Sequence, residues 1–363
     1  MSTPDQAFEV GRNGGRRIER VAIIPEWYGE VMSPCASIRL HAFAQHFPAE
    51  VRYQLPEELV RFRPDVVIWN RAALSTREAV DKMASTAQQL GASLIYDLDD
   101  NLLAMDEHPE RDSYRGLIEA VAVSVARAGR VWCSTIPLRD ALVSRGARAE
   151  WMPNALDPSM WTSSVPSIPR PAHHPGHVLQ LLYMGTRTHD QDFLLLEEAL
   201  SRVHRLRPGK FKLTLVGVAA APLPSHDWLE HRVPPAHVGA SYPAFVHWFI
   251  QQRDFDVGLA PLVDTLFNRS KSSIKVLDYA GIGLPTIASN VPAYALDMDG
   301  DRILVDNTPD RWADILVSAI DGKLPLASIA SAASARASAT AFEQGVRQRW
   351  ISMQNSISGN ERP

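Results

Sequence analysis

A lysine followed by two serines stands immediately before a predicted helix in the second half of the chain. Apolar residues at helical spacing predict this helix over 272–280, so Lys271, Ser272 and Ser273 fall at its N-terminus. Unpaired backbone N–H groups and the macrodipole make a helix N-terminus favourable for an anion. The sequence therefore predicts a phosphate-binding site, with Lys271 as its cation and Lys275, one turn later, as a further candidate or a solvated helix residue.

A second loop with similar features follows the apolar run 179–184. Gly185 allows the chain to turn there, and a helix is predicted shortly after it. Thr186, Arg187 and His189 are then at the carboxyl end of a strand and beside a helix N-terminus. Capping of that helix would explain the same residues, but two helix N-termini at one site would suit a diphosphate.

Carboxylates gather at the end of another predicted strand, 93–97. Asp97 and Asp99 would lie on the same side of an extended chain, as chelation of Mn or Mg by oxygen ligands requires. Asp100 extends the cluster. The structural alternative is capping of a helix that begins before Leu102.

The elements that must position these residues alternate between strand and helix, twice along the chain. The expected strands are 21–25, 65–70, 93–97, 131–134 and 150–152, followed by 179–184, 212–216, 256–261, 286–289 and 303–305. Such alternation predicts two parallel sheets with helices on both faces. The proline-rich stretch 157–176 between the two sets predicts an extended linker, and 1–17 is expected to be a disordered tail.

Composition and charge argue against a nucleic-acid-binding protein, a disulfide-rich protein and a membrane-spanning protein. The chain has 363 residues, enough for two domains, and its formal net charge of -4 gives no support to a nucleic-acid partner. Cys35 and Cys133 are too few for a disulfide framework. No apolar run approaches the roughly 18 residues that cross a membrane. We therefore expect a cytoplasmic protein, with at most a peripheral contact to the inner face of the membrane.

One long ordered motif resembles the donor-site signature of the GT-B glycosyltransferases, in particular the retaining family called glycosyl transferases group 1, or family four. The matching residues are Lys271, Ser272, Lys275, Leu277, Asp278, Tyr279, Gly283 and Pro285. The resemblance implies an α/β fold of two Rossmann-like domains that face each other across a cleft, with a C-terminal helix that crosses back to the N-terminal domain. The expected boundaries are 18–157 for the N-terminal acceptor domain, 158–177 for the linker, 178–335 for the nucleotide-sugar domain and 336–363 for the last helix.

The resemblance also implies roles for individual residues. Lys271 would stabilise the departing diphosphate, Asp278 would hold the ribose hydroxyls, and Ser270 stands where the commoner family pattern has a glutamate that binds the donor sugar. The remaining donor-site candidates are Gly185, Thr186, Arg187, His189, Ser272, Ser273 and Lys275. Asp99 and Asp100 would contact the sugar or the acceptor, and the acceptor or cleft candidates are Gly29, Ser33, Ser37 and Arg39. Asn154 would fix the turn into the linker.

The expected activity is transfer of a sugar from a UDP-, GDP- or dTDP-linked donor to a saccharide or glycolipid, as in polysaccharide biosynthesis, with retention and without a metal cofactor. Preorganised cations and helix dipoles would offset the charge that grows on the leaving diphosphate. Two alternatives remain open at this point. One is a metal-dependent GT-A transferase that uses Asp97 and Asp99, and the other is a non-catalytic subunit that binds a nucleotide sugar.

Overall fold

The computed structural model describes residues 17–108, 110–161, 177–185, 190–217, 225–296 and 300–358. Most of the expected tail and linker, together with Thr186, Arg187 and His189, lies outside the described residues. The chain forms two compact units. Unit 1 contains the described residues up to Asp157, residues 270–272 and those from Ala339 onward, and unit 2 contains residues 158–269 and 273–338.

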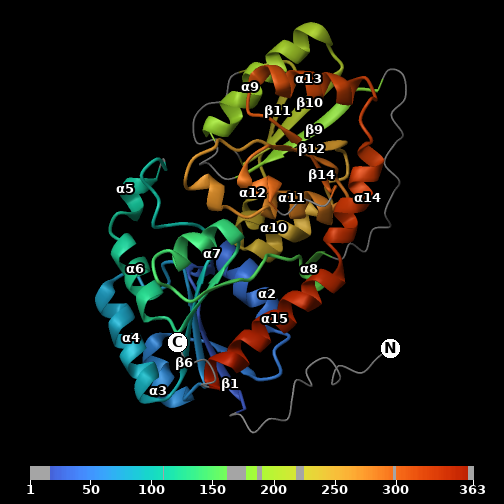
Figure 1. Cartoon of the computed structure of the whole chain (residues 1–363). Coiled ribbons are helices and arrows are strands. Elements are labelled where there is room, and N and C mark those ends of the chain that lie inside the picture. The colour runs from blue at the N-terminus through green and yellow to red at the C-terminus, as the bar shows by residue number, and fades with distance from the viewer. Residues whose placement is uncertain are drawn as a thin grey trace, which may run out of the picture. The chain divides into compact units, whose positions relative to one another are not determined.

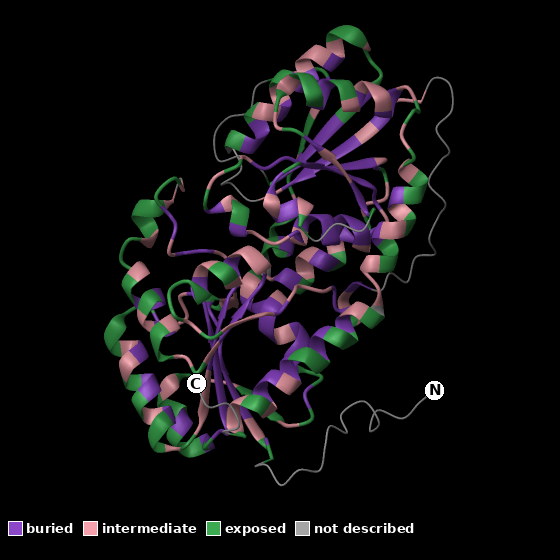
Figure 2. Ribbon diagram, viewed as in Figure 1, coloured by how far each residue is buried: buried purple, intermediate pink, exposed green. Residues whose placement is uncertain are grey.

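Unit 1 is built on a parallel sheet of six strands in the order β4-β1-β5-β6-β7-β8 (Figure 1). The strands are β1 Arg20–Ile24, β4 Glu50–Tyr53, β5 Val66–Asn70, β6 Ser93–Leu98, β7 Arg130–Cys133 and β8 Ala149–Trp151. Every residue of β5 is buried, as expected for a central strand covered on both faces (Figure 2). A short hairpin of β2 Trp27–Tyr28 and β3 Val31–Met32 follows β1.

Helices cover both faces of this sheet, with α4 and α6 on one side and α2 and α15 on the other (Figure 1). The helices of unit 1 are α1 Pro34–Ala36, α2 Ala42–Ala44, α3 Leu59–Phe62, α4 Arg77–Gln89, α5 Arg111–Tyr114, α6 Ile118–Arg127, α7 Ile136–Val143 and α15 Ala339–Ile357, with a π-helical turn at Ser37–His41. The last helix, α15, packs on the N-terminal sheet. Phe342 stacks on Phe43 with ring centroids 4.9 Å apart, and Trp132 Nε1 donates to Ser352 Oγ at 2.9 Å.

Unit 2 repeats this plan with a parallel sheet in the order β11-β10-β9-β12-β13-β14. Its strands are β9 Leu179–Met184, β10 Phe211–Val216, β11 Leu229–Arg232, β12 Val257–Ala260, β13 Thr286–Ser289 and β14 Arg302–Val305. Its helices are α8 Pro158–Trp161, α9 Asp190–Leu206, α10 Tyr242–Phe249, α11 Ile274–Gly281, α12 Pro292–Ala295, α13 Pro309–Ile320 and α14 Leu326–Arg336. Among the described helices of either unit, none combines the length and apolar character needed to cross a membrane.

Each sheet has one point where the strand order reverses. In unit 1 this switch point lies between β1 and β5, and in unit 2 it lies between β9 and β12. Ligands of doubly wound sheets bind outside the carboxyl ends of the strands at such a point. A ligand-binding site is therefore expected at the residues that follow β1, β5, β9 and β12.

The structure differs from the sequence-based expectations in several places, and the short hairpin of β2 and β3 is one of them. The edge strands β4 and β11 were not expected, because most of their residues are polar and none is buried. Residues 158–161 form the short helix α8 where an extended linker was predicted. Helix α11 begins at Ile274 instead of residue 272, so Ser272 lies outside the helix and Ser273 is its N-cap.

Candidate functional site

The carboxyl edge of the unit 1 sheet is organised around Arg71, which sequence reasoning missed. Arg71 follows β5 with a left-handed φ of 45°, and its side chain is 5% exposed. Its Nε lies 3.2 Å from Glu26 Oε2, and its Nη1 lies 2.7 Å from Asp99 Oδ1 and 3.1 Å from Asp100 Oδ2. Three carboxylates from the ends of β1 and β6 therefore share one guanidinium at the switch point. The predicted residues Asp99 and Asp100 are brought together there.

Burial and the Arg71 charge act in opposite directions on these acids. Burial acts to raise the pKa of Asp99, but the Arg71 guanidinium holds it below its ordinary value. Burial raises the pKa of Glu26, and Arg71 offsets only part of that effect. The cluster thus holds an ionised Asp99 beside Glu26, whose carboxyl group binds its proton more tightly.

Arg39, expected as an acceptor or cleft residue, is buried inside unit 1. Its side chain is 1% exposed, and its Nε and Nη2 donate to Asp97 Oδ1 and Oδ2 at 3.1 and 2.6 Å. Its Nη1 donates to Met152 O and, at 3.0 Å, to Asn154 Oδ1. Every nitrogen of the Arg39 guanidinium therefore has a partner inside unit 1. The Arg39 side chain thus links the end of β6 by hydrogen bonds to the segment that follows β8.

The other residues expected near the acceptor have mixed environments. Ser33 and Ser37 are buried, and Ser33 Oγ caps α1 by accepting from Ala36 N at 3.1 Å. Gly29 has a φ of 67° in the turn of the β2–β3 hairpin, a conformation that favours glycine. Of these residues, only Gly29 lies in an exposed loop.

The two aspartates proposed as a metal pair face different arginines. Asp97 uses both oxygens to accept from Arg39, and Asp99 pairs with Arg71. Chelation of one ion by Asp97 and Asp99 would have to break a buried ion pair that has two charge-assisted hydrogen bonds. The geometry therefore disfavours a metal ion held by Asp97 and Asp99 together.

The loop that carries Lys271 is held on both sides of the lysine. Thr135 Oγ1 donates to Ser270 O at 2.8 Å, and Asn154 Nδ2 donates to Ser272 Oγ at 3.0 Å. All of these residues belong to unit 1. Asn154 is itself held by Arg39 at 3.0 Å. A chain of hydrogen bonds thus runs from the buried Arg39 to the loop and restricts the position of Lys271.

Helix α11 places two motif residues in a buried environment. Lys275 and Asp278 are 8% and 7% exposed, and Lys275 Nζ lies 4.7 Å from the centroid of the Tyr183 ring. Burial raises the pKa of Asp278 well above its ordinary value, and the Lys275 charge offsets part of this rise. Asp278 Oδ1 accepts no hydrogen bond from the described residues. A buried acceptor without a donor is costly unless a ligand or water supplies one.

Tyr279, the next residue of the motif, has a structural role at the switch point of unit 2. Its hydroxyl accepts from Met184 N and donates to Leu259 O, both at 3.0 Å, so it joins the ends of β9 and β12. A Cβ at Gly258 would lie 2.5 Å from the Tyr279 ring, so glycine leaves room for the ring. Gly185 N donates to Val216 O at 3.0 Å, directly after β9.

No protein-family model and no curated protein sequence matches the chain. Solved structures match it in fold. The Anabaena protein Alr3699/HepE in complex with UDP-glucose is similar with a TM-score of 0.61 and 15% sequence identity, over 93% of this chain and 100% of its own. A glycosyltransferase from Rickettsia africae ESF-5 is similar with a TM-score of 0.59 and 10% identity, over 95% and 100%. OtsA, in its apo structure, is similar with a TM-score of 0.55 and 14% identity, over 91% and 84%.

These likenesses define the class of fold. The chain is an α/β protein with two parallel-sheet Rossmann-like units, and it has the GT-B fold. The predicted α/β fold of two Rossmann-like domains is thus confirmed. The fold alone does not define the activity, because one fold can carry many functions.

Proposed function

We propose that the chain is a glycosyltransferase of the retaining group 1 type, which moves a sugar from a nucleoside diphosphate donor to a saccharide or glycolipid. The observation that carries this proposal is the position of Lys271. The lysine stands between two hydrogen-bonded serines, two residues before Ser273, the N-cap of α11. A cation beside the first N–H groups of a helix is suited to a diphosphate.

The donor would be held mainly by the motif around α11. Lys271 and the backbone at Ser272 and Ser273 would meet the phosphates, and Gly185 would leave room for them after β9. Asp278 Oδ1, a buried acceptor without a donor among the described residues, supports a contact to the ribose hydroxyls. Alr3699/HepE was crystallised with UDP-glucose and with UDP, which makes uridine the first base to test.

The acceptor would meet unit 1 at the carboxyl edge of its sheet. Asp100 has a side chain that is 25% exposed and Asp99 one that is 13% exposed, so both are more accessible than Glu26. Their carboxylates can accept hydrogen bonds from sugar hydroxyls while Arg71 fixes their positions. We place this reaction on the cytoplasmic side, with peripheral membrane contact where the acceptor is a glycolipid.

Chelation separates the proposed enzyme from its two alternatives. We expect transfer from a UDP-sugar to persist in excess EDTA, because Lys271 and the helix start supply the positive charge that a metal would otherwise provide. Initial rates with and without EDTA, and after addition of manganese, measure this. Reversible loss of all activity would support the metal-dependent alternative. Tight UDP binding without any turnover would support a non-catalytic subunit.

Thr135 is expected to affect turnover through the Lys271 loop. Thr135→Val removes the hydrogen bond to Ser270 O, which should lower kcat by roughly two- to ten-fold. The matched control is Thr76→Val, since Thr76 caps α4 just as Thr135 caps α7, each at 3.2 Å, but does not touch the loop. Both variants lose a helix cap, and Thr135→Ser should restore kcat. Equal kcat in the two valine variants would contradict a positioning role for Thr135.

Asp278 is expected to control nucleotide affinity. Asp278→Ala should raise the dissociation constants of UDP and of the UDP-sugar alike, by roughly ten- to a hundred-fold, because the ribose is held the same way before and after transfer. Since burial raises the pKa of Asp278, wild-type affinity should increase with pH as the carboxyl ionises, and Asp278→Asn should flatten that profile. Calorimetry measures the dissociation constants and their dependence on pH. Asp314→Ala, at an exposed position, is the control. Unchanged affinity would leave Asp278 a structural residue.

A further inference from the structure

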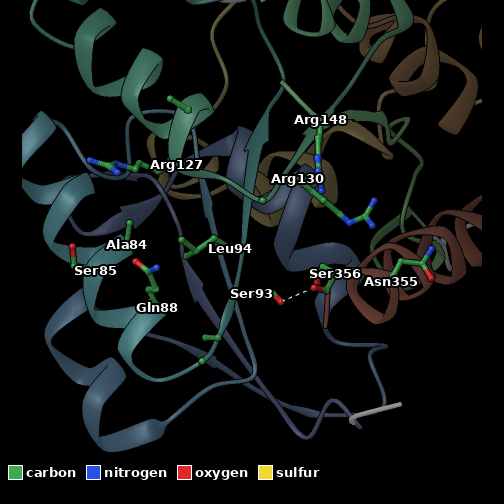
Figure 3. Close-up of a pocket in the computed structure, with 14 residues that line it drawn as sticks. Ala84, Ser85, Gln88, Ser93, Leu94, Arg127, Arg130, Arg148, Asn355 and Ser356 are labelled. Carbon is green, nitrogen blue, oxygen red and sulfur yellow. Dashed lines mark hydrogen bonds between the residues drawn. The ribbon is translucent and has the colours of Figure 1, made fainter. Parts of the chain in front are cut away.

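Two neighbouring hollows lie at the amino-terminal edge of the unit 1 sheet, the edge opposite to Asp99 and Asp100 (Figure 3). The first has a volume of about 600 Å³ and is bounded by the end of α4, the starts of β6 and β7, and the last turn of α15. The second, of about 560 Å³, shares Ala126, Gly129 and Arg148 with the first. Both volumes are in the range of pockets that hold small ligands.

Two arginines lie next to each other in the first hollow, at the start of β7 and directly before β8. Val131 pairs with Ala149 in the register of β7 and β8, and Val131 N donates to Arg148 O at 2.9 Å. Arg130, the first residue of β7, and Arg148, which directly precedes β8, therefore lie side by side. Arg130 forms an ion pair with Glu150, whereas no acid in the described part of the chain pairs with Arg148. Like charges at such positions repel, so an additional anion would be stabilising.

The charges around the hollows favour an anion. Among the described residues that line them there is no aspartate or glutamate, and Arg145 adds a cation to the second hollow. Arg127 is turned toward Asp81, to which its Nε donates at 2.7 Å. The carboxyl ends of α4 and α6 carry partial negative charge here. That effect is confined to the last turn of each helix and is weaker than a charge-assisted arginine–phosphate hydrogen bond.

Neutral hydrogen-bonding groups complete the lining. Figure 3 shows Ser85 and Gln88 on the α4 side of the first hollow and Asn355 on the opposite side, near Arg130. Ser93 Oγ donates to Ser356 O at 2.9 Å and fixes the wall between β6 and α15. Hydroxyl and amide side chains around a pair of arginines are suited to a ligand with both a phosphate and several hydroxyl groups.

We propose that the two hollows form a second binding site, for a phosphate-bearing sugar or polyol, with Arg148 as the main contact of the phosphate. Arg130 would approach the same phosphate, and Ser85, Gln88 and Asn355 would contact the hydroxyl groups. The proposal does not depend on the transferase function. The six residues of β6 span roughly 20 Å, so this site is separate from the carboxyl edge of the sheet.

Titration of the full chain with glucose 6-phosphate tests the site, with glucose as the neutral comparison. We expect glucose 6-phosphate to bind, glucose not to bind, and saturating UDP to leave the binding unchanged. Arg148→Ala should weaken binding by about ten- to a hundred-fold. Ala126→Trp should block both hollows by volume alone. The control is Arg61→Ala, because Arg61 is an exposed arginine of the same unit that lies outside the hollows.

A lipid headgroup is the second source of the same chemistry. Vesicles that contain phosphatidylglycerol, compared with phosphatidylcholine alone, test it with the same variants. Vesicle binding that requires Arg148, without binding of glucose 6-phosphate, would assign the site to a lipid. Displacement by UDP, binding that survives both Arg148→Ala and Ala126→Trp, or binding of neither probe would overturn the proposal. Since UDP affinity is measured on the same samples, failure here is distinct from failure of the transferase function.

Discussion

Replacement of Lys271 by alanine is expected to lower turnover by about ten-fold to more than a hundred-fold while the fold is retained. A charge-assisted hydrogen bond contributes about 1.5–3 kcal/mol, and each 1.36 kcal/mol of barrier corresponds to a factor of ten in rate. Negative charge on the leaving diphosphate is greater in the transition state than in the bound donor. The loss should therefore be larger in kcat than in the affinity for the donor.

The geometry around Lys271 makes this experiment specific. The loop is fixed by Thr135 and Asn154 through Ser270 and Ser272, so alanine at position 271 leaves those hydrogen bonds in place. Lys82→Ala, at an exposed position of α4, is the control because it also removes a lysine. Steady-state kinetics of both variants give kcat and KM separately. Full activity of Lys271→Ala would remove this lysine from the mechanism.

The interior of both sheets could be predicted from the sequence because buried parallel strands are short apolar runs. Strands β5 and β13 have no exposed residue, and both were expected within one residue of their bounds. The edge strands β4 and β11 carry charged residues and partly face solvent, so their sequences resemble loops. They form strands because they pair with β1 and β10, which lie elsewhere in the sequence.

The candidate site shows the same difference between residues that lie close together in the sequence and residues whose partners are distant in it. The motif from Lys271 to Asp278 could be found because its residues are close together in the sequence. Arg71 could not, because no local spacing marks it, and its importance comes from acids at positions 26, 99 and 100. Arg39 was expected as an acceptor or cleft residue, yet Asp97, 58 positions away, supplies the charge that allows its burial.

Arg71 is also expected to have the largest effect on stability. Arg71→Met should lower the free energy of unfolding by about 3–5 kcal/mol, because removal of one partner leaves buried carboxylates without a compensating charge. The matched control is Arg77→Met. Arg77 is 56% exposed and pairs with Asp81 and Glu119 at 3.6 and 3.3 Å, an arrangement that contributes at most about 1 kcal/mol.

The pH dependence of this effect tests its electrostatic origin. The folded-state pKa of Asp99 is below its ordinary value, so its ion pair with Arg71 contributes fully above the ordinary pKa and is lost as pH falls through the folded value. The difference between wild type and Arg71→Met should therefore be largest near neutral pH and should shrink below pH ~4. Urea unfolding at several pH values, followed by circular dichroism, measures it. A difference independent of pH would mean that Arg71 stabilises unit 1 by packing and not by its charge.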